Sequence, residues 1–172
     1  MKTLTLAFVM LAAIPAVAQT VPMTPLCPAD AQPIPTELAS WPNKKPLIAA
    51  TTSASLGAAR AIPGVAVNLT LADTPAVTYP VRPAHPGGSV SHGGLIAFTI
   101  DRPGTYRVAI GSGAWLDLLK GSTSLESVGH GHGPNCSGIR KMVDFTLQPG
   151  DYVLQIAGNG TANLPLLITK LP

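Results

Sequence analysis

Short runs of alternating apolar residues, separated by glycine and proline, constrain the fold of this chain more than any other feature. In "VAVNLTL" (65–71), every second residue is Val or Leu, and side chains that alternate in this way face one side of a β-strand. Pro-Gly, Gly-Gly and Gly-Ser-Gly breaks separate such runs, and no stretch keeps a helical period. Further runs lie at 76–81, 95–100, 105–110, 114–119, 124–128, 142–147, 151–157 and 165–170.

This pattern predicts an all-β fold, a single antiparallel jelly-roll-like β-sandwich over residues 47–172. The preceding segment, residues 19–46, contains seven prolines. Because proline fixes φ and removes a backbone donor, we expect a Pro-rich extended N-terminal arm there. Within the arm we expect a short helix near residues 36–40, with Trp41 anchored on the core.

One pattern occurs twice in the second half of the chain. "IAFTIDRPGTYRVAIGSG" (96–113) and "VDFTLQPGDYVLQIAGNG" (143–160) share a Phe-Thr-apolar run, a Pro-Gly pair and a following Tyr. A Pro-Gly turn between alternating runs predicts a β-hairpin in each segment. We expect the two hairpins to face each other across the sandwich.

The first 18 residues have the features of a secretory signal peptide: Lys2, an apolar run over residues 4–14, and Ala-Val-Ala at 16–18. Cleavage near Ala18 would place the mature chain in the periplasm or outside the cell. The apolar run is too short for a membrane span, and no later segment reaches the required length of about 18 residues. We therefore expect no membrane span.

Sparse charge excludes several classes of partner. Charged residues make up 11% of the chain, and no basic cluster exceeds Lys44-Lys45 or Arg140-Lys141, so nucleic acid has no electrostatic footprint here. No G-x-S-x-G elbow and no phosphate-binding glycine motif is present. A small ligand, a metal ion or an envelope protein remains as the expected partner.

Two cysteines lie far apart in the sequence, Cys27 in the arm and Cys136 in "SVGHGHGPNCSG" (127–138). In an exported chain such a pair favours a disulfide. The bridge would close a loop of about 110 residues and nominally stabilise the fold by roughly 4 to 5 kcal/mol. The alternative, in which Cys136 is a thiolate metal ligand, requires Cys27 to stay free.

All four histidines fall in two glycine-rich segments, His85 and His92 in "AHPGGSVSHGG" and His130 and His132 in "GHGHG". In an extended segment the imidazoles of His130 and His132 point to the same side. Imidazole is a ligand for copper, zinc and iron, so the pair predicts a divalent transition-metal site, with His92 and His85 as further ligands. One alternative is an exposed turn in which the histidines are purely structural. Another is a metal-free role in acid-base chemistry or in contact with a ligand. Acids that could add a carboxylate ligand are Asp117, Glu126 and Asp144.

Arg140 and Lys141 lie between the histidine segment and the run at 142–147. One interpretation is a solvated start of a strand. The other is that the two cations attract an anionic ligand to the histidines. We expect Trp115, in the run at 114–119, to pack in the core or to plug the space between the sheets. The alternative is an exposed platform on which a sugar stacks.

Residues 90–160 resemble the bacterial pre-peptidase C-terminal domain through the Phe…Gly-x-Tyr pattern of the repeated segments and through "WLDLLK". This resemblance implies a jelly-roll-like, non-catalytic module of the kind attached to secreted enzymes. The mature chain is also similar to short exported all-β proteins of sphingomonad-type bacteria, through "PGGSVSHGGLIAFTI" and "GHGHGPNCSGIRKMVDFTLQPGDYVLQ". Some of these are described as homogentisate 1,2-dioxygenases, which implies an iron-dependent dioxygenase as an alternative activity.

Three functions are therefore open. The first is an exported binding module that holds a small ligand or a transition metal (copper, zinc or iron) through the histidine loop. The second is a small non-haem metalloenzyme of the dioxygenase type, for which the sequence assigns no catalytic residue. The third is a purely structural or interaction module.

Overall fold

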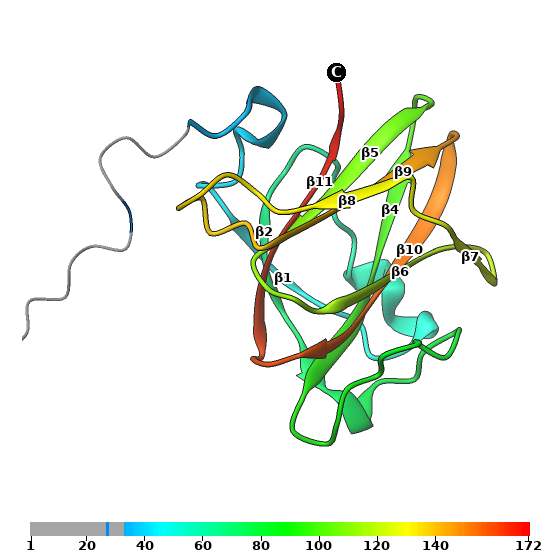
Figure 1. The fold of residues 1–172 in the computed structure, drawn as a ribbon. Coiled ribbons are helices and arrows are strands. Elements are labelled where there is room, and N and C mark those ends of the chain that lie inside the picture. Colours follow the sequence, from blue (N-terminus) through cyan, green and yellow to red (C-terminus); the bar gives the residue numbers. More distant parts are fainter. Residues whose placement is uncertain (1–26, 28–32) are drawn as a thin grey trace, which may run out of the picture.

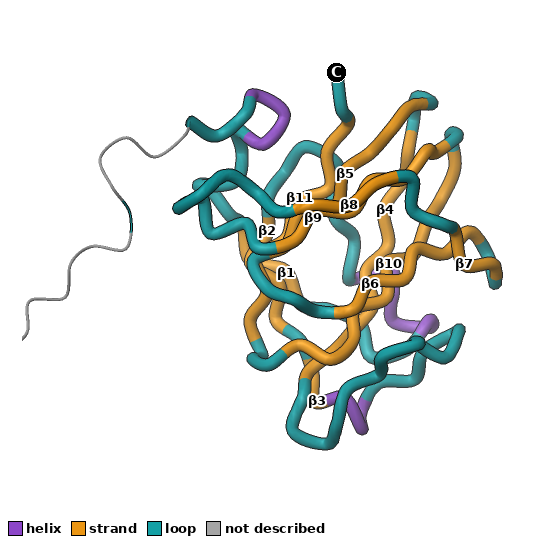
Figure 2. The backbone as a smooth tube through the Cα atoms, viewed as in Figure 1, coloured by secondary structure: helices purple, strands orange, loops and turns teal. Residues whose placement is uncertain are grey.

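The computed structural model describes Cys27 and residues 33–172 (Figure 1). The expected signal peptide and its cleavage site near Ala18 lie outside the described residues, and of the Pro-rich arm only Cys27 and residues 33–46 are described. Two β-sheets form the body of the molecule, with loops and three short 3-10 helices around them (Figure 2). Within the described part of the chain, no helix is both long enough and apolar enough to cross a membrane.

Each sheet combines strands that are distant in the sequence. Neighbouring strands are antiparallel except β1 and β2, which are parallel. The six-stranded sheet has the order β1 (Lys45–Ile48), β2 (Val67–Thr70), β11 (Asn163–Lys170), β5 (Gly104–Ile110), β9 (Lys141–Leu147), β8 (Gly129–Gly131). The five-stranded sheet has the order β3 (Ala72–Asp73), β4 (His92–Ile100), β10 (Gly150–Asn159), β6 (Trp115–Lys120), β7 (Thr123–Leu125). The predicted all-β sandwich is confirmed, whereas its jelly-roll designation stays a prediction.

The main core lies between the two sheets and consists of the alternating apolar residues of their strands. Phe98 of β4 and Tyr152 of β10 are opposite each other in the register, and their rings stack with centroids 5.7 Å apart. Because these inward positions are almost completely buried, the period-2 pattern of the sequence is the cause of the sandwich.

A smaller apolar cluster fixes the start of the described chain to the body. The 3-10 helix η1 (Thr36–Leu38) and Trp41 pack in one buried cluster with Ile139 and Leu167. Trp41 is 3% exposed, and its Nε1 donates a hydrogen bond of 2.8 Å to the carbonyl of Ser137. The expected short helix and the anchoring role of Trp41 are both confirmed.

The repeated segments are arches between the sheets, so the prediction of two hairpins is wrong. β4 belongs to the five-stranded sheet and β5 to the six-stranded sheet, while β9 and β10 make the reverse crossing. The two arches pair with each other, since β4 pairs with β10 and β5 with β9. At each crossing a glycine, Gly104 or Gly150, has φ near +150° (154° and 144°), a conformation that residues with a Cβ rarely adopt.

The same hydrogen bond closes both arches. The hydroxyl of Tyr106 donates to the carbonyl of Arg102 at 2.9 Å, and that of Tyr152 donates to the carbonyl of Gln148 at 2.7 Å. Each tyrosine therefore bonds to the residue four positions before it. The pattern that predicted hairpins instead marks a corner where the chain leaves one sheet for the other.

Several short segments differ from the strand predictions. Of the run predicted at 124–128, only the first two residues lie in a strand, β7, and residues 126–128 form none. Residues 76–81 form no strand, because the 3-10 helix η3 (Thr74–Ala76) leads into a loop that binds the sheet through side chains. In that loop, Tyr79 donates its hydroxyl proton to the carbonyl of Ile156. Strands β1, β3 and β8 were not predicted, since "KPLI", "AD" and "GHG" carry too few alternating apolar residues to be recognised.

An ion pair on the six-stranded sheet offers a test of this packing. Arg107 of β5 binds Asp144 of β9 through two hydrogen bonds of 2.8 Å, and Glu37 lies 3.9 Å from the same guanidinium. All three side chains are 20% exposed or less. Replacing Arg107 with Met should lower the free energy of unfolding by about 2 kcal/mol, because it leaves two poorly solvated carboxylates without their cation. Urea denaturation measures this difference.

The matched control is Arg60→Met, which removes an ion pair to Asp151 in which both side chains are well exposed. Exposed pairs contribute little because water screens them, so this variant should unfold close to the wild type. Equal destabilisation by the two substitutions would contradict the structural role assigned to Arg107.

Candidate ligand-binding groove

A groove of about 680 Å³ opens where the edges of the two sheets part. Strand β7 pairs only with Leu118–Lys120 of β6, so residues 115–117 have a strand partner on one side only, in β10. Across the opening lie β8 and the start of β9. We call this feature the edge groove; it is lined by Gly113, Trp115, Leu116, Asp117, Leu125, Ser127, His130, Gly131, His132, Arg140, Lys141, Val143 and Phe145.

The floor of the edge groove is apolar because it is the margin of the core. Leu116 of β6 and Val143 and Phe145 of β9 are buried and belong to the main core cluster. Leu125 of β7 packs against them. A ligand in the groove would therefore contact hydrocarbon on its inner side.

Strand pairing places the two loop histidines at the rim. In the register of β8 with β9, His130 lies opposite Val143, and residues directly opposite each other share one face of a sheet. His130 thus lies on the groove side, and His132, two residues later, follows it there. Both side chains are exposed and line the groove.

One ring nitrogen of His132 is already engaged. Its Nδ1 lies 2.7 Å from the carbonyl oxygen of Arg140. Because a carbonyl oxygen only accepts hydrogen bonds, Nδ1 carries the proton and donates. In the neutral imidazole, Nε2 is then the nitrogen with the free lone pair.

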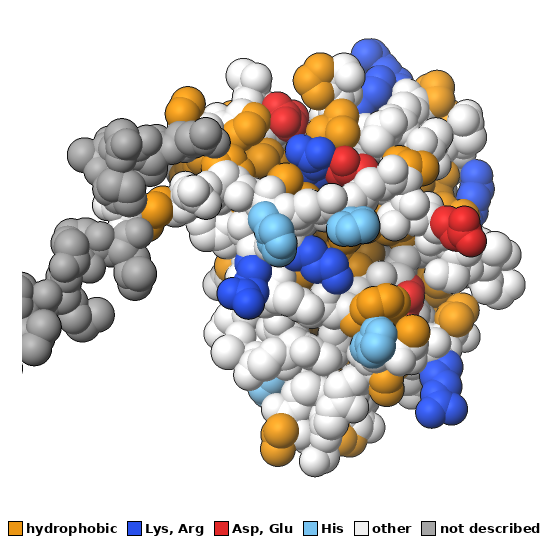
Figure 3. Space-filling view, viewed as in Figure 1, with side chains coloured by type: hydrophobic (Ala, Val, Ile, Leu, Met, Phe, Trp, Pro, Cys, Tyr) orange, Lys and Arg blue, Asp and Glu red, His pale blue; other side chains and the backbone are white. Residues whose placement is uncertain are grey.

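Two cations share this rim, as the blue and pale-blue side chains gathered on one face in Figure 3 show. Arg140 is exposed, whereas Lys141 is half-buried. The ammonium group of Lys141 donates to the carbonyl of Ala114 at 3.0 Å and lies 5.5 Å from the centroid of the Trp115 ring. Burial lowers the pKa of Lys141, and the nearby carboxylate of Asp117 partly opposes this shift.

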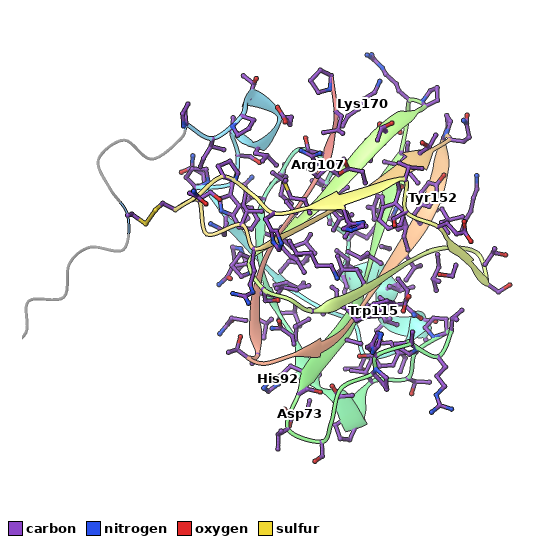
Figure 4. The ribbon with its side chains drawn as sticks, viewed as in Figure 1. Asp73, His92, Arg107, Trp115, Tyr152 and Lys170 are labelled. Carbon is purple, nitrogen blue, oxygen red and sulfur yellow. A yellow bond between two sulfur atoms is a disulfide. The ribbon has the colours of Figure 1, made fainter. Side chains whose placement is uncertain are left out.

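Trp115 forms one wall of the groove and does not belong to the buried core. The expected core position is therefore wrong, whereas the expected plug between the sheets stays a prediction. The Trp115 indole, labelled in Figure 4, is partly exposed. The indole Nε1 donates a hydrogen bond of 2.9 Å to Asp117. The other carboxylate oxygen of Asp117 lies 3.4 Å from the Gln155 side-chain nitrogen. The ring of His85 packs edge-on against Trp115, with centroids 4.5 Å apart.

The fourth predicted metal ligand, His92, does not line the edge groove. It lies on β4 beside Asp73 of β3, with Nδ1 3.1 Å from a carboxylate oxygen (Figure 4). The two atoms are within ion-pair distance but lack the alignment of a hydrogen bond. In the described part of the chain, no three His, Cys, Asp or Glu side chains form a group that could hold a metal ion.

The loop between the two rim segments is tied to the arm. Cys27 and Cys136 form the predicted disulfide, with Cα atoms 5.4 Å apart. The alternative in which Cys136 is a thiolate metal ligand is therefore wrong. Within the loop, Ser137 donates its hydroxyl proton to the carbonyl of Pro134 and accepts a hydrogen bond from the backbone of Ile139. The bridge thus fixes the segment that connects His132 to Arg140.

The sequence pointed to the rim of the groove and to Asp117 as a possible ligand, but it did not indicate that Trp115, Asp117 and Phe145 border one opening. Trp115 and Asp117 sit at the outward positions of an otherwise apolar strand, and this placement of an aromatic and an acid was the available signal. Phe145 follows the core pattern of its strand, and nothing in its sequence context indicated that it borders an opening.

The chain matches no protein-family model and no curated protein sequence.

Proposed function

We propose that this protein is an exported binding module and that its edge groove takes a small organic anion with a flat apolar body. One observation carries the proposal: an apolar floor is bordered by two cations and two imidazoles. Asp117, the single acid among the lining residues, already accepts a hydrogen bond from Trp115.

The energetics of Lys141 favour an anion in the groove. Its ammonium group is partly withdrawn from water and has one carbonyl as its hydrogen-bond partner. Burying a charge is unfavourable; burial lowers the pKa of Lys141 for this reason, and the nearby carboxylate of Asp117 only partly opposes the shift. A carboxylate beside Lys141 and Arg140 would offset that cost through charge-assisted hydrogen bonds.

The shape of the groove favours a flat ligand. The Trp115 ring forms a wall, and Leu116 and Phe145 supply the floor. Small-ligand sites combine an apolar lining with a few polar groups that set orientation, and this arrangement fits an aromatic or alicyclic carboxylate.

The expected export rests on the N-terminal sequence and is supported by the disulfide. Disulfides persist in oxidising compartments such as the periplasm. The Cys27–Cys136 bridge is compatible with such a location. The dioxygenase and purely structural alternatives stay predictions from the sequence.

Calorimetric titration with 2-naphthoate tests the proposal. The Lys141→Met variant should bind this probe about tenfold more weakly than the wild type, the equivalent of about 1.4 kcal/mol. 2-Naphthamide, which has the same rings but no charge, should bind weakly to both proteins.

Lys120 provides a matched control. Its ammonium group also lies 5.5 Å from an aromatic centroid, that of Tyr152, but it does not line the edge groove. Lys120→Met should leave the affinity for 2-naphthoate unchanged. Equal losses in the two lysine variants, or equal affinity for the acid and the amide, would overturn the proposal.

A further inference from the structure

We infer that His130 and His132 hold a divalent transition-metal ion at the rim of the edge groove, and that the carboxylate of a bound organic anion completes its coordination. The inference rests on the proposed function for the third ligand. It reduces the four candidate metal ligands of the sequence to two histidines, and it places the metal ion and the organic anion in contact at one site.

The orientation of His132 suits metal binding. Its Nδ1 proton is held by the Arg140 carbonyl, which leaves Nε2 as the nitrogen available to a ligand. Histidines that bind metals commonly donate their second ring N–H to a carbonyl or carboxylate, which fixes the ring and raises its basicity. His132 therefore already makes the hydrogen bond to a backbone carbonyl that metal-binding histidines commonly make.

His130 is placed to act with His132. The two residues are two positions apart, and His130 is set on the groove side by its pairing opposite Val143. Alternate residues of an extended segment lie roughly 6 to 7 Å apart at their Cα atoms, and two imidazoles at this separation can reach one ion. Copper and zinc accept imidazole ligands readily.

Two imidazoles supply too few ligands for a tightly bound metal ion, and the positive charges beside them repel a metal ion that has no anion bound to it. Arg140 and Lys141 line the same rim, and no third His, Cys, Asp or Glu of the described residues joins the pair. An organic carboxylate in the groove changes both conditions, because it neutralises the cations and supplies an oxygen ligand. The metal should therefore bind tightly only together with the anion.

The shared site predicts how much a bound anion changes the affinity for the metal. Linked binding is reciprocal, so an anion that raises the affinity for the metal gains the same factor from the metal. We expect 2-naphthoate to raise the affinity of the full secreted chain for Cu²⁺ about tenfold, within the usual range of such coupling. 2-Naphthalenesulfonate, an anion that coordinates metals poorly, should raise it much less.

The experiment is a titration of Cu²⁺ with no anion, with 2-naphthoate and with 2-naphthalenesulfonate. Four proteins are compared: the wild type, His130→Ala, the double variant His130→Ala/His132→Ala, and His92→Ala. Electron paramagnetic resonance of the bound Cu²⁺ counts its nitrogen ligands. The single variant keeps the His132–Arg140 hydrogen bond, which guards against a loss of binding through misfolding.

The expected result is a naphthoate-dependent increase in the wild type and in His92→Ala that is absent from both His130 variants. An equal increase with the sulfonate would overturn direct coordination by the carboxylate. Naphthoate binding without any effect on Cu²⁺ would overturn the metal site and keep the proposed function. Failure of naphthoate to bind at all would overturn both.

Discussion

Replacing Phe98 with alanine should lower the free energy of unfolding by about 4 kcal/mol. Phe98 has no exposed surface and stacks on Tyr152. Removing a buried phenyl ring loses its transfer free energy and leaves a cavity that the surrounding strands cannot fill. Phe98 belongs to the main core cluster, to which both sheets contribute residues, so both sheets lose packing.

Equilibrium unfolding in urea, followed by circular dichroism, measures the effect. The control is Val90→Ala, at an apolar side chain that is 88% exposed, and it should change the stability by less than about 0.5 kcal/mol. A loss below about 1 kcal/mol for Phe98→Ala would mean that the two sheets do not meet as described.

The double substitution Cys27→Ser/Cys136→Ser should lower the free energy of unfolding by about 3 kcal/mol. The bridge joins residues 109 positions apart, and a cross-link over so long a loop restricts the unfolded chain strongly. We expect somewhat less than the nominal value for a loop of this length, because Trp41 and Ile139 hold the same segments by packing.

The disulfide substitution should also weaken binding in the groove. The bridged loop carries His132 at one end and Arg140 at the other, and more freedom in the loop reduces the preorganisation of both. Treatment of the wild type with a reducing agent should reproduce both changes. Unchanged stability and unchanged 2-naphthoate affinity after reduction would contradict the role given to the bridge.

Much of the fold could be predicted from alternation, because burial on one face has a local signature. The run at 65–71 places its apolar residues inward, and the runs at 105–110 and 142–147 coincide closely with β5 and β9. The path of the chain between sheets could not be predicted in this way. A Pro-Gly corner looks the same in sequence whether the next strand joins the same sheet or the opposite one.

The candidate site was predictable only in part, for a similar reason. The histidine pair and the adjacent Arg140-Lys141 are neighbours in sequence, so their proximity was evident. Trp115 reaches them only because β6 and β9 border the same opening. Contacts between the edges of two sheets depend on strand order, and local patterns do not encode it.

The two tryptophan indole N–H signals of the chain show most directly whether the edge groove is the ligand site. Trp115 lines the edge groove, whereas Trp41 is buried and bonded to Ser137. In a two-dimensional ¹H–¹⁵N spectrum titrated with 2-naphthoate, the Trp115 indole signal should shift in a saturable way and the Trp41 signal should stay in place. A saturable shift of Trp41 with Trp115 unmoved, or no saturable shift of either, would contradict the proposal that the edge groove is the ligand site.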